Sequence, residues 1–142
     1  MRIANRPVPR SRRRGAAAVE FAFVLPLLVL IVLGCIDFGR FAYSYIAITN
    51  AARAGAGYGC THTFTVATFP AWQAKTKQAA ADEMSGFDPS LFQIADPLFI
   101  PESPTLWQVQ VEVSYTFQTF IDWPGIPNQV PMYRKVIMRN VR

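Results

Sequence analysis

One long apolar run limits what this chain can fold into. From Ala16 to Ile36 there are 21 residues, and only Glu20 among them is charged. At 1.5 Å rise per residue a helix of this length spans roughly 31 Å, about the hydrocarbon thickness of a lipid bilayer. The run therefore predicts a transmembrane helix in direct contact with the bilayer. Pro26 lies within it and predicts a kink, because proline removes one backbone hydrogen bond.

The basic residues are concentrated in front of this run. Six of the fourteen lysines and arginines precede Gly15, and the remaining 127 residues carry eight basic and nine acidic groups. Arginines beside an apolar helix set topology, so residues 1–15 are expected to stay in the cytoplasm and the part after Asp37 to be exported. Nucleic-acid binding is not expected, because it needs basic residues spread over a folded face. We expect residues 1–15 to lack regular structure.

The helical pattern continues beyond the apolar run. A stripe at spacings of three and four residues predicts a helix-packing face, formed by Phe38, Phe41, Tyr45, Ile48, Ala52 and Gly55. Residues 47–59 are rich in alanine and glycine, which let helices approach closely. The glycines at 55, 57 and 59 are then expected to end the helix. The predicted result is one helix of about 40 residues, half in lipid and half projecting outward.

The remainder predicts a small module that combines a helix with antiparallel strands. Residues 61–69 fit a strand or an extended loop. Pro70 opens a predicted helix over Ala71–Ser85, which Gly86 closes. Residues 87–105 contain four prolines and predict an irregular loop.

The clearest strand is Leu106–Ile121, where apolar and polar residues alternate. Residues 122–131 supply a turn, and Met132–Val141 should return as the partner strand. The predicted fold class is therefore α+β: a long N-terminal helix followed by a small α+β module with an antiparallel hairpin or short sheet.

No pattern in the chain indicates catalysis. His62 is the only histidine, and there is no Gly-rich phosphate loop, no CxxC and no nucleophile elbow. Cys35 and Cys60 would lie roughly 37 Å apart in a continuous helix, too far for a disulfide. We expect no enzymatic activity, no metal and no cofactor.

Glu20 needs a partner wherever the apolar run enters lipid. An uncompensated carboxylate in a membrane helix costs about 2.5–3.5 kcal/mol on insertion scales. The sequence around it, GAAAVEF from Gly15 to Phe21, resembles a type IV prepilin processing site, in which a membrane peptidase cuts after the glycine.

The resemblance extends over residues 15–56. This stretch is similar to the TadE-like family of pseudopilins from the tight-adherence (Flp pilus) system. The motifs that carry it are at Ala18–Ala22, Leu25–Pro26, Gly34 with Asp37, Gly39–Arg40 and Ala51–Gly55.

The resemblance implies a division of the chain and a set of partners. Residues 1–15 would be a basic prepilin leader, residues 16–56 the transmembrane and projecting pilin-like helix, and residues 57–142 the exported α+β module. A prepilin peptidase would cut after Gly15, and the new ammonium on Ala16 would pair with Glu20, between neighbouring subunits, as a register device. Further partners would be other pilin or pseudopilin subunits and inner-membrane platform proteins, contacted through the helix. The implied role is a pseudopilin or minor pilin in the bacterial inner membrane or the assembled pilus.

Two other interpretations remain open. The chain could be a single-span envelope protein that keeps its leader and whose exported module binds a ligand or partner. It could also be a lipoprotein, because Val32-Leu33-Gly34-Cys35 resembles a lipobox in which Cys35 is acylated. The bulky Leu33 and the unbroken helical stripe after Cys35 fit a lipoprotein poorly.

Overall fold

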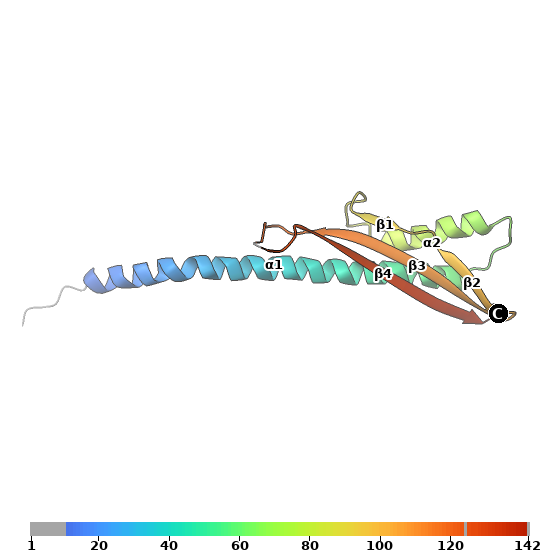
Figure 1. Ribbon diagram of the computed structural model, residues 1–142, viewed down its shortest axis with the longest axis horizontal. Coiled ribbons are helices and arrows are strands. Elements are labelled where there is room, and N and C mark those ends of the chain that lie inside the picture. The colour runs from blue at the N-terminus through green and yellow to red at the C-terminus, as the bar shows by residue number, and fades with distance from the viewer. Residues whose placement is uncertain (1–10, 124, 142) are drawn as a thin grey trace, which may run out of the picture. The chain divides into compact units, whose positions relative to one another are not determined.

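The computed structural model describes residues 11–123 and 125–141. Within these residues lie two helices, α1 (Ser11–Thr61) and α2 (Phe69–Glu83), and four strands, β1 (Phe92–Ile94), β2 (Leu98–Ser103), β3 (Leu106–Gln118) and β4 (Gln129–Val141) (Figure 1). The chain forms two compact units, one ending at Phe38 and the other, which we call the module, beginning at Gly39. The α+β class predicted from the sequence is confirmed.

The four strands just named form one antiparallel sheet with β3 at its centre. β4 pairs along all of β3, from Leu106 opposite Val141 to Gln118 opposite Gln129. β1 and β2 pair with the other side of β3. The predicted hairpin is thus confirmed, although its return strand begins at Gln129 rather than at Met132.

The prediction of an irregular loop over residues 87–105 is wrong, since β1 and β2 both lie there. The prolines of this stretch suggested a break in regular structure. Pro101, however, lies in β2 opposite Trp107, and among the described strands β2 pairs with β3 alone. An edge strand tolerates proline because an N–H that faces away from the sheet makes no ladder hydrogen bond. Residues 62–68, by contrast, form no strand, and α2 follows them from Phe69.

The core of the module lies between the sheet and the two helices. The alternation predicted for β3 is confirmed, because Val109, Val111 and Val113 are fully buried. The helices contribute mostly small side chains to the same core, together with one tryptophan: Ile48, Ala51, Ala52 and Ala56 from α1, and Trp72 and Ala80 from α2. Small residues on α1 let the helix lie close to the sheet.

Two glycines permit this close approach, and they do not end the helix as predicted. α1 continues through Gly55, Gly57 and Gly59. A Cβ atom at Gly59 would lie 2.7 Å from Val109 Cγ1 and 3.1 Å from Trp72 Cζ2. The Trp72 indole Nε1 also donates a hydrogen bond to the Gly59 carbonyl, at 3.2 Å. Gly55 is enclosed in a similar way, whereas a Cβ at Gly57 would meet nothing within 4 Å.

Cys60, next along α1, is buried against β4. Its Sγ donates a hydrogen bond to the Met138 carbonyl at 3.4 Å, and the Asn140 side-chain amide donates to the Cys60 carbonyl. Burial raises the pKa of the Cys60 thiol. Both cysteines of the chain are free thiols, Cys35 exposed and Cys60 buried.

The glycine contacts predict opposite effects for two neighbouring substitutions. Gly59→Ala should destabilise the module by about 1–3 kcal/mol, because the new methyl group overpacks against Val109 and Trp72. Gly57→Ala is the matched control and should stabilise α1 by roughly 0.5–1 kcal/mol, since alanine is the better helix former. Urea unfolding of the full chain in detergent, followed by tryptophan fluorescence, measures both. Equal stability of the two variants would contradict the packing described here.

The burial of Cys60 predicts slow thiol chemistry. Alkylation by iodoacetamide should be slower at Cys60 than at an exposed cysteine placed at Val66, because the thiolate is the reacting species. Folded stability should fall as pH rises above the ordinary thiol pKa of about 8.5, since the unfolded thiol then loses its proton before the folded one. Alkylation followed by mass spectrometry, and unfolding curves at pH 7 to 10, test the two parts. Equal alkylation rates at the two positions would show that Cys60 is accessible.

Candidate membrane anchor and assembly segment

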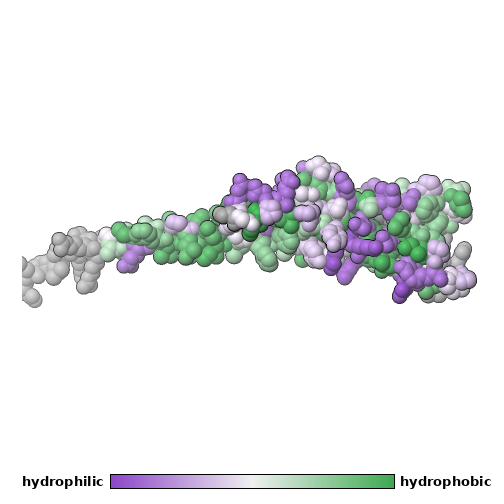
Figure 2. Space-filling view, in the orientation of Figure 1, coloured by the Kyte–Doolittle hydropathy of each residue, from purple (hydrophilic) through white to green (hydrophobic). Residues whose placement is uncertain are grey.

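Between Gly15 and Ile36, α1 exposes apolar side chains on all sides. Only Leu33 and Gly34 in this stretch are partly buried, and Phe23 is 80% exposed. Figure 2 shows the stretch as an almost continuous hydrophobic surface. A helix that is apolar all round is suited to lipid or to the interior of a bundle, not to water.

This helix is the candidate membrane span of the chain. By length and composition α1 is able to cross a membrane, and its most apolar stretch is not buried within the chain. The finding is consistent with a membrane-anchored protein.

Glu20 lies one helical turn after Ala16 on the same face of α1, because residues four apart are neighbours on a helix. The Glu20 side chain is exposed. In the uncut chain the Ala16 nitrogen belongs to a peptide bond inside α1, which begins at Ser11. Only cleavage of the bond between Gly15 and Ala16 would place a positive charge at that nitrogen.

The predicted processing site is exposed on the surface of α1. Gly15 is exposed, and a Cβ atom there would meet nothing within 4 Å. Contrary to the expectation of irregular structure, residues 11–15 belong to α1. Arginine and alanine are good helix formers, so the helix extends upstream from the Ala16–Ala18 run. The other part of the predicted leader, residues 1–10, lies outside the described residues.

Pro26 lies within α1, which is continuous through it. The kink expected there stays a prediction.

The predicted packing face of α1 divides into two parts. Ile48 and Ala52 are fully buried in the core of the module. Phe41 is half-buried, and its ring meets Phe117 of β3 edge-on with centroids 5.5 Å apart. These three residues therefore pack α1 against the rest of the module.

Phe38 and Tyr45 are the more exposed members of that face. Phe38 is 73% exposed and Tyr45 is 38% exposed. The Arg134 guanidinium lies 4.9 Å from the centre of the Tyr45 ring, a cation–π distance. Helix packing between subunits through any residue of this face stays a prediction.

Aromatic contacts fix the sheet to α1 near the start of the module. Tyr43 stacks on Phe87 at 5.7 Å, and Phe87 meets Tyr115 edge-on at 5.3 Å. The Arg40 guanidinium lies 5.5 Å from the Phe117 ring. These contacts position the end of β3 beside Arg40, and β4 begins next to it, since Val130 pairs with Phe117.

The other end of the module holds an aromatic cluster that the sequence did not predict. Its members come from the loop after α1, from α2 and from two strands: Phe64, Phe69, Trp72, Phe99 and Trp107. An open pocket of about 110 Å³ lies beside it, lined in part by His62 and Phe64. His62 stacks on Tyr58 with centroids 3.9 Å apart. The separate aromatic residues were visible in the sequence, but no periodicity links positions 64, 99 and 107.

No metal centre is found among the residues that the structure describes. Within residues 11–123 and 125–141, no three His, Cys, Asp or Glu side chains are grouped so that they could hold a metal ion.

The exposed apolar stretch of α1, residues 15–36, carries a single acid, Glu20, one turn after Ala16. Residues 15–57 match the family model described as TadE-like protein. The resemblance seen in the sequence is thereby confirmed over this segment. No curated protein and no solved structure gives a match. The TadE-like match contains Gly15, Glu20, Pro26 and the whole packing face, and residues 58–142 lie outside it.

Proposed function

We propose that this chain is a pseudopilin or minor pilin of a tight-adherence (Flp) type IV pilus. A prepilin peptidase cuts it after Gly15, and the mature chain joins a pilus or its initiating complex through α1. The observation that carries the proposal is the exposed apolar stretch of α1, residues 15–36, inside the TadE-like match. Its one acid, Glu20, follows Gly15 by five residues.

The electrostatics of α1 support this role for Glu20. Cleavage would create an α-ammonium group at Ala16, at the positive end of the shortened helix. A carboxylate and an ammonium brought together at the edge of the membrane offset much of each other's desolvation cost. A contact between the Glu20 carboxylate of one subunit and the Ala16 ammonium of the next would set the register of neighbouring helices.

The charge distribution supports an orientation in the inner membrane. Six arginines precede the span, whereas the rest of the chain is close to neutral. By the positive-inside rule the N-terminus is cytoplasmic and the module is exported. In this proposal the chain is an assembly component without catalytic activity or a cofactor. Its partners are the peptidase, other pilin subunits and inner-membrane platform proteins.

The proposal predicts a mature N-terminus at Ala16. Mass spectrometry of the chain from its native membrane should find Ala16 first, and Gly15→Leu should abolish the cut. Gly39→Leu is the matched control, because a Cβ at either glycine meets nothing within 4 Å. The control should be cut normally.

The same measurement separates the alternatives. A mature chain that retains the arginine-rich head overturns the pilin proposal in favour of a single-span envelope protein. A chain that begins at a lipid-modified Cys35 overturns it in favour of a lipoprotein.

The pairing proposal predicts that the charge of Glu20, rather than its size, is required for assembly. Glu20→Gln keeps the shape and removes the charge, so it should be cut normally and fail to enter the pilus. Glu20→Asp keeps the charge and should retain at least part of the incorporation. Immunoblots of sheared pili and of membranes measure both steps. Incorporation of Glu20→Gln at the wild-type level would remove the register role.

A further inference from the structure

The loop between β3 and β4 exposes apolar side chains at one end of the module. We call residues 119–123 and 125–128 the β3–β4 loop. Phe120 is 74% exposed and Ile126 is 54% exposed. The single charged residue of the loop is Asp122, and its carboxylate accepts a hydrogen bond from the Asn128 side-chain amide. The loop thus exposes apolar side chains, and its one carboxylate already accepts a hydrogen bond within the loop.

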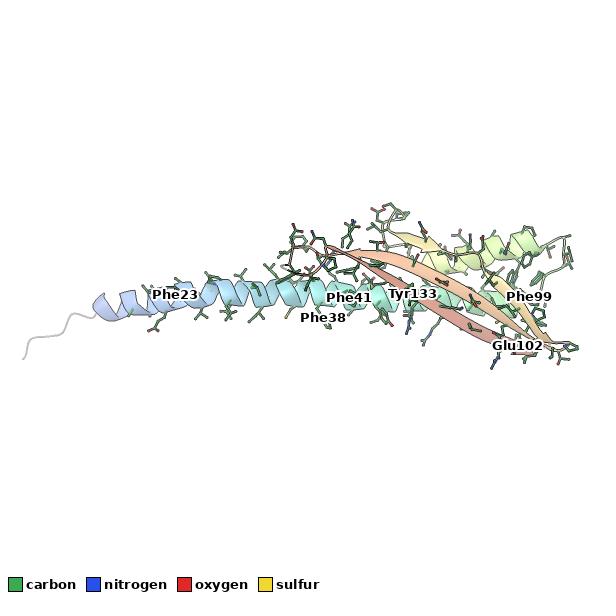
Figure 3. All side chains as sticks on the ribbon, in the orientation of Figure 1. Phe23, Phe38, Phe41, Phe99, Glu102 and Tyr133 are labelled. Carbon is green, nitrogen blue, oxygen red and sulfur yellow. The ribbon has the colours of Figure 1, made fainter. Side chains whose placement is uncertain are left out.

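The course of β3 determines which end of the module carries this loop. Early in β3, Val109 packs against Gly59 of α1, and late in β3, Phe117 packs against Phe41. β3 therefore runs opposite to α1, toward the part of the helix that leads back to the apolar run. Figure 1 shows the loop at that end of the sheet, and Figure 3 labels Phe41 near this end and Phe99 near the other.

Chain connectivity then places this end of the module close to lipid. Phe41 follows Ile36, the last residue of the apolar run, by five residues. Five residues of helix advance about 7.5 Å. The headgroup layer on each side of a bilayer is roughly 5–8 Å thick, from the difference between the hydrocarbon and total thickness. Phe41, and with it the end of β3 that packs on it, therefore lies within roughly one headgroup thickness of the end of the apolar run.

We propose that Phe120 and Ile126 form an interfacial anchor that inserts into the headgroup layer of the bilayer on the exported side. The proposal rests on the membrane span assigned under the proposed function. Aromatic side chains are enriched at this depth of membrane proteins, and burial removes the apolar surface of both residues from water. The module then touches the membrane at two places, the helix and the loop. A two-point attachment limits how far the module tilts on its helix before the subunit leaves the membrane.

The test uses a fluorescent probe on the full-length chain. Cys35 and Cys60 are replaced by alanine, and an environment-sensitive NBD group is attached to a single cysteine at position 126. The chain is reconstituted into phosphatidylcholine vesicles that carry a nitroxide quencher at the level of the headgroups. The matched control carries the probe at position 66, because Val66 is 95% exposed and lies in the loop between α1 and α2.

The anchor predicts strong quenching of the probe at position 126 and little quenching at position 66. Adding Phe120→Ser should lower the quenching at position 126, whereas Tyr133→Ser, at a 73% exposed residue of β4, should leave it unchanged. Equal quenching at positions 66 and 126 would overturn the proposal. A probe at position 126 that another protein surface covers, and that the nitroxide therefore does not quench, would overturn it too.

An alkaline wash of the same vesicles separates this inference from the span itself. Protein that stays in the membrane but shows no quenching at position 126 overturns the anchor and leaves the proposed function standing. Protein that the wash extracts has no span, and this result overturns both.

Discussion

The structure depends on one helix that must be kept from water in two different ways. Over residues 15–36, α1 is apolar on every side, and the described part of the chain covers almost none of it. Over residues 39–61 the same helix has a face of alanines and glycines that its own sheet and α2 cover. The first half therefore needs lipid or neighbouring helices around it, whereas the second half is covered by the sheet and α2 of the same chain. This division explains why the composition of α1 changes from leucine and valine to alanine and glycine along its length.

Much of the fold followed from local sequence patterns, and the failures share a cause. Strict alternation predicted β3 and the hairpin, because a half-buried strand needs that pattern. β1 and β2 were missed because prolines usually interrupt strands, and a sequence does not show which strands lie at an edge. The glycines at 55, 57 and 59 predicted a helix end, but α1 continues through them. Whether a glycine ends a helix or permits a close contact depends on Val109 and Trp72, which are distant in the sequence.

The candidate site was predictable to a similar degree. The apolar run alone showed that Glu20 needs a partner, whereas the nature of that partner came from the resemblance and not from spacing. Two members of the packing face, Ile48 and Ala52, are core residues of the module. Phe38 has the same helical spacing but is mostly exposed, because periodicity identifies a face and does not show what covers it. The aromatic cluster around Phe64 and the position of the β3–β4 loop depend on long-range pairing, which no local pattern encodes.

The upstream extension of α1 has a consequence for how a peptidase would reach the chain. The bond after Gly15 lies inside a helical turn, where the backbone is folded onto its own hydrogen bonds. An enzyme that grips an extended strand would first have to unwind that turn. Among the residues between Ser11 and Leu25 glycine is the poorest helix former, about 1 kcal/mol worse than alanine. Gly15, the residue before the scissile bond, would then also be the position where unwinding the helix costs the least free energy.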